Sequence, residues 1–317
     1  MAILGMPPIA PVSVFSSRSQ ECIKRLVAHN AESLDTLVNS IPLLQLTSQT
    51  HRTAKYISRT TAKMRRAAVL VLLYEEHGHL RVLLTTRAKT LRSHPGQTAL
   101  PGGATDDTDK DIVETAYREA YEEVGLPLQH PSIHTLCTLR PFLAWTRSLI
   151  LVTPVVAVVA DPTILSGLKA SPGEVELIFT HPLEAILDPP LSSEEPLVAP
   201  NSKLWPSDAE FYNYTDSEWT WLGNSTYRMH RFRSAAASIT GLTSEILIMA
   251  ASIAYGRLPS FECYAPGQLT TINETLAALD PAGFFTWTQS FAQRGTKVGP
   301  TQQQVTVSGI AGVVSLA

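Results

Sequence analysis

The chain has 317 residues, of which 44% are hydrophobic and 17% are charged, and 25 basic against 28 acidic side chains give a formal net charge of −3. The low share of charged residues excludes wholesale disorder, and the length allows either two average domains or one domain with extensions. The near-neutral balance excludes the strongly basic surface of a typical nucleic-acid-binding protein, so an anionic ligand would be met by local positive charge or by a metal.

The cysteines and the apolar segments exclude further classes of protein. Cys22, Cys137 and Cys263 are widely spaced and form no CxxC pair, which argues against a disulfide framework and against a thiolate zinc site. The longest apolar run, 149–160, is shorter than the roughly 20 residues that a bilayer requires. The first 20 residues hold three prolines and no clear cationic start, unlike a secretory signal or a transit peptide. We therefore expect a soluble globular protein without a membrane partner.

The first predicted elements are helices followed by a pair of strands. Between Ser17 and Leu44, apolar residues recur at mostly three- and four-residue intervals, which predicts one or two amphipathic helices. Two β-rich runs, 67–74 and 80–84, flank a His-Gly pair at 77–78 and indicate a hairpin or neighbouring strands.

The second half of the chain continues this mixture of elements. Strands are predicted at 149–159, buried on both faces, and at 175–179. From 188 to about 224 the chain is rich in Pro, Ser and Asp, which indicates an insertion or long loop. Three tryptophans in this segment should hold it in a fixed position. A strand at 227–232 and a helix at 242–255 would return the chain to the domain. Strands interspersed with helices imply a layered α/β fold.

These elements suggest three parts. We predict an N-terminal helical extension over 1–64, a central domain over 65–260 with the insertion at about 188–224, and a C-terminal extension over 261–317. The last part loses its periodicity, and its end at 296–317 has little charge, so we expect a poorly ordered tail.

One predicted helix has unusually clear ends. Asp111 lies three residues before Glu114, as in a capping box, and Gly125 stands where a helix ends in a left-handed residue. The helix should therefore run from about Ile112 to Val124. At 100° per residue, its apolar side chains form one stripe. They are Val113, Ala116, Tyr117, Ala120 and Val124.

The same helix carries a row of acids. Glu119, Glu122 and Glu123 are spaced i, i+3 and i+4, and three carboxylates this close repel one another unless a cation lies between them. Mg²⁺ is commonly held by a few carboxylates together with substrate phosphates. An isolated group of this kind is more often a solvated acidic surface, so the preceding loop decides between the two interpretations.

That loop favours a ligand site. Pro101-Gly102-Gly103 lets the backbone approach a ligand without obstruction by a Cβ atom, and it leads to a helix N-terminus with free N–H groups. Arg118 is a possible phosphate ligand, but we favour a structural role in which it anchors the acids or the loop.

The segment 118–126, Arg-Glu-Ala-Tyr-Glu-Glu-Val-Gly-Leu, resembles the second half of the Nudix box of the Nudix hydrolases. The first half departs from that pattern. The spacing from Gly103 to Arg118 is one residue longer, and Asp109 stands where the family has an isolated Glu. The resemblance implies the Nudix fold, an α/β/α sandwich around a mixed β-sheet, here with an N-terminal helical extension.

An upstream motif is similar to that of one branch of the family, the coenzyme A diphosphatases of the yeast peroxisomal type and their animal relatives. It comprises Leu-Leu-Thr-Thr-Arg at 83–87, then Arg92, then Leu-Pro-Gly-Gly at 100–103. Coenzyme A carries a pyrophosphate and a 3′-phosphate, and planar bidentate recognition of phosphate favours arginine. For Lys89 we expect a solvated role, and for His94 a loop-bracing one.

The resemblance implies a Mg²⁺- or Mn²⁺-dependent enzyme that hydrolyses coenzyme A or its derivatives to 3′,5′-ADP and 4′-phosphopantetheine or its acyl form. The metal would lower the pKa of a bound water, the nucleophile. The implied metal ligands are Glu119, Glu122, Glu123 and the Gly103 carbonyl. The implied catalytic residues are Glu122, Glu123 and Glu174, with Glu123 or Glu174 as the base. The implied substrate-binding residues are Arg87, Arg92, Gly102 and Gly103.

Two alternatives stay open. One is a Nudix hydrolase of another compound, such as ADP-ribose, a dinucleotide or an oxidised nucleotide. The other is a nonhydrolytic nucleotide-binding regulatory protein, although the complete set of three glutamates argues against lost catalysis. We expect a small-molecule substrate and an intracellular location, in the peroxisome by resemblance or else in the cytoplasm or mitochondrion. The sequence leaves the oligomeric state unknown.

Overall fold

The computed structural model describes residues 12–29, 65–145, 149–219, 222, 224–271, 274–275, 278 and 313–315. The helices are α1 (Ser17–Ala28), α4 (Ile112–Val124) and α5 (Gly241–Tyr255), with short 3₁₀ turns η1 (Val12–Val14), η3 (Pro162–Gly167), η4 (Glu184–Ile186) and η5 (Pro189–Ser192). The strands are β1 (Arg65–Glu76), β2 (His79–Arg87), β3 (Thr98–Ala99), β4 (Gly102–Ala104), β5 (Ile133–Thr138), β6 (Phe142–Trp145), β7 (Leu149–Val159), β8 (Val175–Pro182), β9 (Tyr212–Trp219), β10 (Ser225–Phe232), β11 (Ile239–Thr240) and β12 (Val313–Ser315).

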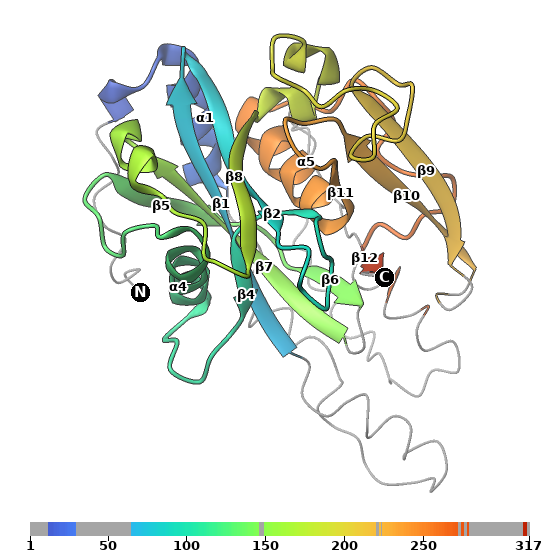
Figure 1. The fold of residues 1–317 in the computed structure, drawn as a ribbon, viewed down its shortest axis with the longest axis horizontal. Coiled ribbons are helices and arrows are strands. Elements are labelled where there is room, and N and C mark those ends of the chain that lie inside the picture. The colour runs from blue at the N-terminus through green and yellow to red at the C-terminus, as the bar shows by residue number, and fades with distance from the viewer. Residues whose placement is uncertain are drawn as a thin grey trace, which may run out of the picture.

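The main sheet is mixed and is built around β1 (Figure 1). This strand pairs in parallel with β7 and antiparallel with β2 and β4. On the β2 side the sheet continues to β3 and β8, and on the β7 side it continues to β5, β6 and β12. A separate antiparallel sheet has the order β11-β10-β9. The mixed sheet predicted from the sequence is therefore confirmed.

The alternation of side chains along β1 divides the core into two layers. Leu70 and Leu72 are buried against the apolar stripe of α4, whereas Val71 and Leu73 belong to the larger cluster that includes α1 and α5. Successive residues of a strand point to opposite faces, so one apolar run serves both layers. Full burial of each such side chain contributes about 1.5–3 kcal/mol. The result is the predicted α/β/α sandwich.

Most of the predicted elements are present. The hairpin predicted around residues 77–78 is formed by β1 and β2. The strands predicted at 149–159 and 175–179 are β7 and β8, and the helix predicted at 242–255 is α5. Helix α4 has the predicted bounds. The segment 188–224, predicted to be an insertion or long loop, contains strand β9, which was not predicted. Most of β9 is exposed, and its pairing with β10 along its whole length stabilises it. None of the described helices is both long and apolar enough to cross a membrane.

Helix α1 is packed into the main core. Cys22, Ile23 and Leu26 are buried in the cluster that includes α5, and the guanidinium of Arg25 donates a hydrogen bond to the carbonyl of Ala254 (3.1 Å). The rest of the predicted helical region, 30–64, lies outside the described residues, as does most of the predicted C-terminal tail.

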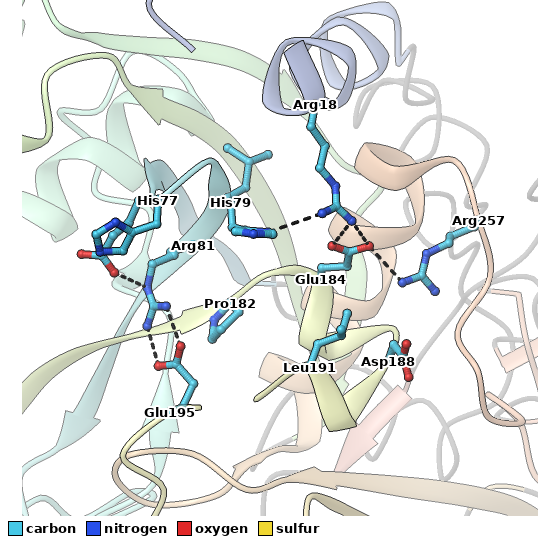
Figure 2. Close-up of a pocket in the computed structure, with 12 residues that line it drawn as sticks. Arg18, His77, His79, Arg81, Pro182, Glu184, Asp188, Leu191, Glu195 and Arg257 are labelled. Carbon is cyan, nitrogen blue, oxygen red and sulfur yellow. Dashed lines mark hydrogen bonds and ion pairs between the residues drawn. The ribbon is translucent and has the colours of Figure 1, made fainter. Parts of the chain in front are cut away.

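An ion pair at the start of α1 joins it to η4 (Figure 2). Glu184 lies between Arg18 and Arg257 and accepts hydrogen bonds from both, at 2.5 Å and 3.2 Å. Nearby, Arg81 forms a bidentate pair with Glu195, with both N–O distances at 2.7 Å. These residues line a hollow of about 390 Å³. The three arginines are thus paired with carboxylates, and the Arg18–Glu184 pair docks the start of α1 on η4.

The packing of α1 predicts a stability effect. Leu26→Ala removes a side chain with no exposed surface from the main core and should lower the free energy of unfolding by about 2–5 kcal/mol. Val14→Ala, at a side chain that is 56% exposed just before α1, is the matched control and should change it by less than about 0.5 kcal/mol. Urea denaturation measures both. Equal midpoints for Leu26→Ala and the wild type would show that α1 is not part of the cooperative core.

Candidate active site

Helix α4 begins and ends through local hydrogen bonds. The carboxylate of Asp111 accepts the backbone N–H of Glu114 (2.9 Å), and Gly125 has a φ of 70° and donates its N–H to the carbonyl of Tyr121 (2.9 Å). Both end signals predicted from the sequence are confirmed. Burial of Ala116 and Ala120 against the sheet fixes the rotation of the helix and turns its acidic side toward β4.

The two glycines of β4 permit close packing within the protein. A Cβ atom on Gly102 would lie 2.3 Å from the carbonyl oxygen of Ala68 and 2.6 Å from Cα of Val69. One on Gly103 would lie 2.6 Å from the carboxylate carbon of Glu119. A side chain at 102 would collide with the backbone of β1, so glycine is required there, whereas a side chain at 103 would displace the Glu119 carboxylate from β4.

Arg118 connects the loop before α4 with the acids on it. Its guanidinium forms a bidentate pair with Asp109 (2.8 and 3.0 Å), donates to Glu119 (2.9 Å) and to the carbonyl of Ala104 (3.0 Å), and lies 3.3 Å from Glu122. The Asp109 side chain is only 4% exposed, and hydrogen bonding by Arg118 holds its pKa well below the usual range. The anchoring role favoured for Arg118 is thus observed, and Asp109 is its partner.

Glu123 lies in an unusual environment for a carboxylate. Its carboxylate is half-buried and accepts the backbone N–H of Gly102 (3.2 Å). Burial raises its pKa to about 7, with further repulsion from Glu119 and Glu174, while the Gly102 hydrogen bond and Arg87 act in the opposite direction. A carboxyl group that titrates near neutral pH has the property required of a general base.

Glu174 is brought near Glu123 by the chain that follows η3. This segment donates two N–H groups to carbonyls at the end of α4, from Lys169 to Val124 (2.9 Å) and from Ser171 to Glu123 (2.8 Å). Those carbonyls have no partner within the helix, so the loop completes the helix end. The exposed Glu174 follows, and its carbonyl accepts the N–H of Ala88 (2.9 Å). Both candidates for the base are therefore placed by α4 and its contacts.

The upstream loop brings one of its two predicted arginines to the site. Arg87 ends β2, donates to the carbonyl of Ser93 (3.3 Å) and lines a cavity of about 350 Å³ that also includes Gly102. Arg92 is exposed and does not line this cavity. Lys89 is paired with the exposed Glu176 (2.5 Å), in agreement with a surface role.

A second part of the cavity lining was not predicted. It is formed by Met229 of β10 and by Leu242, Thr243 and Ile246 of α5. These residues lie far along the chain from the two motifs, and nothing in their local sequence marks them as a site. His94, with a φ of 54°, lies on the Arg87 side, and burial lowers its pKa.

The candidate metal ligands have suitable chemistry, but they do not form a ready-made cage. Within the described ranges, no three His, Cys, Asp or Glu side chains converge closely enough to hold a metal ion. Glu119 and Glu122 are turned toward Arg118. Burial raises the pKa of Glu119 and, more strongly, that of Glu123, and mutual repulsion adds to both shifts, so a bound cation would favour the charged forms. Carboxylate and carbonyl oxygens suit Mg²⁺ or Mn²⁺, and the residues present fit such an ion.

Comparisons with known proteins point to one family. The NUDIX domain family model matches residues 64–201. Nudix hydrolase 15, mitochondrial, of Arabidopsis thaliana is 39% identical over 202 residues, which are 63% of this chain and 62% of the relative. Nudix hydrolase 22, chloroplastic, of the same plant is 37% identical over 200 residues, 62% of this chain and 58% of the relative.

A third relative is covered over most of its length. Peroxisomal coenzyme A diphosphatase ndx-8 of Caenorhabditis elegans is 32% identical over 231 residues, 72% of this chain and 84% of the relative. The chain belongs to the Nudix hydrolase family. It spans about three fifths of the length of the two plant relatives.

The Asp109–Arg118 pair predicts that removing the charge of Asp109 destabilises the folded protein. Asp109→Asn should lower the free energy of unfolding at pH 7 by about 1.5–3 kcal/mol, since a charge-assisted pair is lost. Because the folded-state pKa of Asp109 is depressed, its contribution is present above its ordinary pKa of 3.8 and is lost as the pH falls through the folded value. The exposed Asp107→Asn in the same loop is the control. Denaturation of both variants at pH 7 and pH 3 tests this, and equal stabilities at pH 7 would contradict it.

Proposed function

We propose that this chain is a metal-dependent diphosphatase that hydrolyses the pyrophosphate bond of coenzyme A or its derivatives, yielding 3′,5′-ADP and 4′-phosphopantetheine or its acyl form. The observation that carries the proposal is the meeting of the two motifs at Gly102. This residue lines the cavity together with Arg87, and its N–H group binds Glu123. A cationic side chain thus lines the cavity, and the acidic helix reaches the cavity lining through the contact between Glu123 and Gly102.

The residues of the cavity and of the neighbouring acidic helix suit the reaction. Glu119, Glu122, Glu123 and the Gly103 carbonyl would hold Mg²⁺ or Mn²⁺, which neutralises the pyrophosphate and lowers the pKa of a water molecule. The water oxygen forms a bond to phosphorus, the bridging P–O bond breaks, and a carboxylate takes the proton of the water. Arg87 would bind the pyrophosphate, because its guanidinium matches phosphate geometry.

Glu123 is the favoured base, because its half-buried carboxylate lies against Gly102, which lines the cavity, and the exposed Glu174 beside it is the second candidate. Glu122, which is half exposed and 3.3 Å from Arg118, is more suited to ligate a cation than to take a proton.

Coenzyme A is supported as the substrate by the upstream motif and by the name of the Caenorhabditis elegans relative. The names of the three relatives mention the mitochondrion, the chloroplast and the peroxisome. We propose an intracellular location with a small molecule as partner, and the peroxisomal assignment rests on the resemblance to that branch.

A panel of substrates tests the proposal. The purified protein is incubated with Mg²⁺ and, separately, with coenzyme A, ADP-ribose, a dinucleotide and an oxidised nucleoside triphosphate, and the products are identified by mass. The expected result is cleavage of coenzyme A to 3′,5′-ADP and 4′-phosphopantetheine. If another compound is cleaved in preference, that compound replaces coenzyme A as the proposed substrate. If none is cleaved, the result indicates a nonhydrolytic protein.

The acidic helix should be required for turnover. Glu123→Gln and Glu122→Gln keep the side-chain volume but remove a charge, so kcat for coenzyme A should fall by about 10²–10⁴-fold with little change in folding. Glu114→Gln, on the same helix and close to Lys110 outside the cavity, is the control. Steady-state kinetics and thermal unfolding are measured together. Near-normal turnover of either variant would remove that residue from the site.

The two arginines should differ in which phosphate they bind. Arg87 lines the cavity and lowers the pKa of Glu123, so it lies on the pyrophosphate side, whereas the exposed Arg92 is free to reach a more distant group. Arg87→Ala should lower kcat/KM for both coenzyme A and dephospho-coenzyme A by about ten- to a hundredfold. Arg92→Ala should lower it for coenzyme A alone, because only that substrate has the 3′-phosphate.

The comparison of the two substrates is its own control, since damage to the fold affects both equally. Equal losses for Arg92→Ala on the two substrates, or no loss on either, would contradict a 3′-phosphate contact.

A further inference from the structure

The cavity next to Glu123 is lined by two parts of the chain, residues 69–102 and residues 229–246. One wall, from the first part, includes Arg87 and His94 together with the apolar Val69, Ala99 and Leu100. The other is formed by Met229, Leu242 and Ile246, from β10 and α5. This second wall lies outside residues 64–201, which the family model matches, so it is specific to the part of the chain that follows.

The place of the reacting group decides what the second wall receives. Gly102 and Arg87 line the cavity, and both act directly on Glu123, one through a hydrogen bond and the other through its charge. The pyrophosphate therefore belongs at that end. The remaining space must receive one of the two groups attached to the pyrophosphate, either the nucleoside or the pantetheine arm.

The lining favours an aliphatic chain. No Phe, Tyr or Trp side chain is among the described residues that line the cavity, whereas purine bases are commonly bound by stacking on aromatic rings. Leu242 and Met229 are half-buried and offer aliphatic surface, and the flexible thioether of methionine adapts to chains of different shape. Ile246 is 1% exposed and belongs to the main core, which holds this wall in place.

The hydroxyl groups along the cavity are already used within the protein. Thr98 donates to the carbonyl of Ala237 (2.6 Å), Thr243 to the carbonyl of Thr98 (3.3 Å), and Thr240 to the carbonyl of His230 (2.8 Å). The hydrogens of these three hydroxyls are therefore committed to backbone carbonyls, which makes the wall more apolar than its composition suggests. The first two bonds also tie β3 to the segment that carries the second wall.

We propose that Met229 and Leu242 form a specificity-determining wall that receives the pantetheine arm of the substrate and the first carbons of an acyl group on its sulfur. The inference rests on the proposed function and adds the orientation of the substrate, with the arm toward α5 and the nucleotide directed away from it. An arm in contact with this wall makes the acyl group a determinant of catalytic efficiency.

Filling the cavity tests this orientation. Met229→Trp and Leu242→Trp should lower kcat/KM for octanoyl-coenzyme A and raise the inhibition constant of 4′-phosphopantetheine by about ten- to a hundredfold, whereas inhibition by 3′,5′-ADP should change by less than about twofold. Leu258→Trp, at a 63% exposed side chain just after α5, is the matched control. All acyl derivatives release 3′,5′-ADP, so one assay serves the whole series.

Smaller side chains give an independent test if a tryptophan variant fails to fold. Met229→Ala and Leu242→Ala enlarge the cavity and should shift the preferred acyl chain to a longer one. If the tryptophan substitutions weaken inhibition by 3′,5′-ADP, relative to the wild type, more than they weaken inhibition by 4′-phosphopantetheine, this inference alone is overturned. An unchanged acyl preference in the alanine variants would overturn it as well. A wild-type protein that cleaves no coenzyme A derivative would overturn the proposed function instead.

Discussion

The guanidinium of Arg118 is the interaction on which the candidate site depends. It binds Asp109 from the preceding loop, Glu119 on its own helix and the carbonyl of Ala104 in β4. Without a cation at this point, the acids of the loop and the helix would repel one another at close range. Gly103 allows the sheet to approach the same carboxylate. One positive charge and one missing Cβ therefore bring the loop, the sheet and the acidic helix together.

The two ends of α4 extend this arrangement to the rest of the site. Asp111 begins the helix, and the segment that includes Ser171 completes its last carbonyls before Glu174 is reached. The position of Glu174 near Glu123 is thus a consequence of helix termination. On the other face of the sheet, α1 and α5 fill the main core, and α5 also supplies one wall of the cavity. Substrate selection and core packing therefore share a helix.

What the sequence predicted and what it missed follow from the range of the interactions. The bounds of α4 were predictable because Asp111 and Gly125 act on neighbouring backbone groups. The pairing of Asp109 with Arg118 depends on how a loop one residue longer than the family pattern folds back, which spacing alone does not define. Strand β9 was missed because it has little burial of its own. Leu242 meets the cavity only through tertiary packing, so no local pattern indicated it.

Hydrolysis of coenzyme A in water enriched in oxygen-18, with Mg²⁺ and mass analysis of the products, tests most directly whether this helix and loop direct water onto a pyrophosphate. Attack of water on phosphorus predicts one labelled oxygen in either 3′,5′-ADP or 4′-phosphopantetheine and none in the other product. The same label should be lost with turnover when Glu123 is replaced by Gln. Products without label, or cleavage at a bond other than the pyrophosphate, would contradict the proposed chemistry.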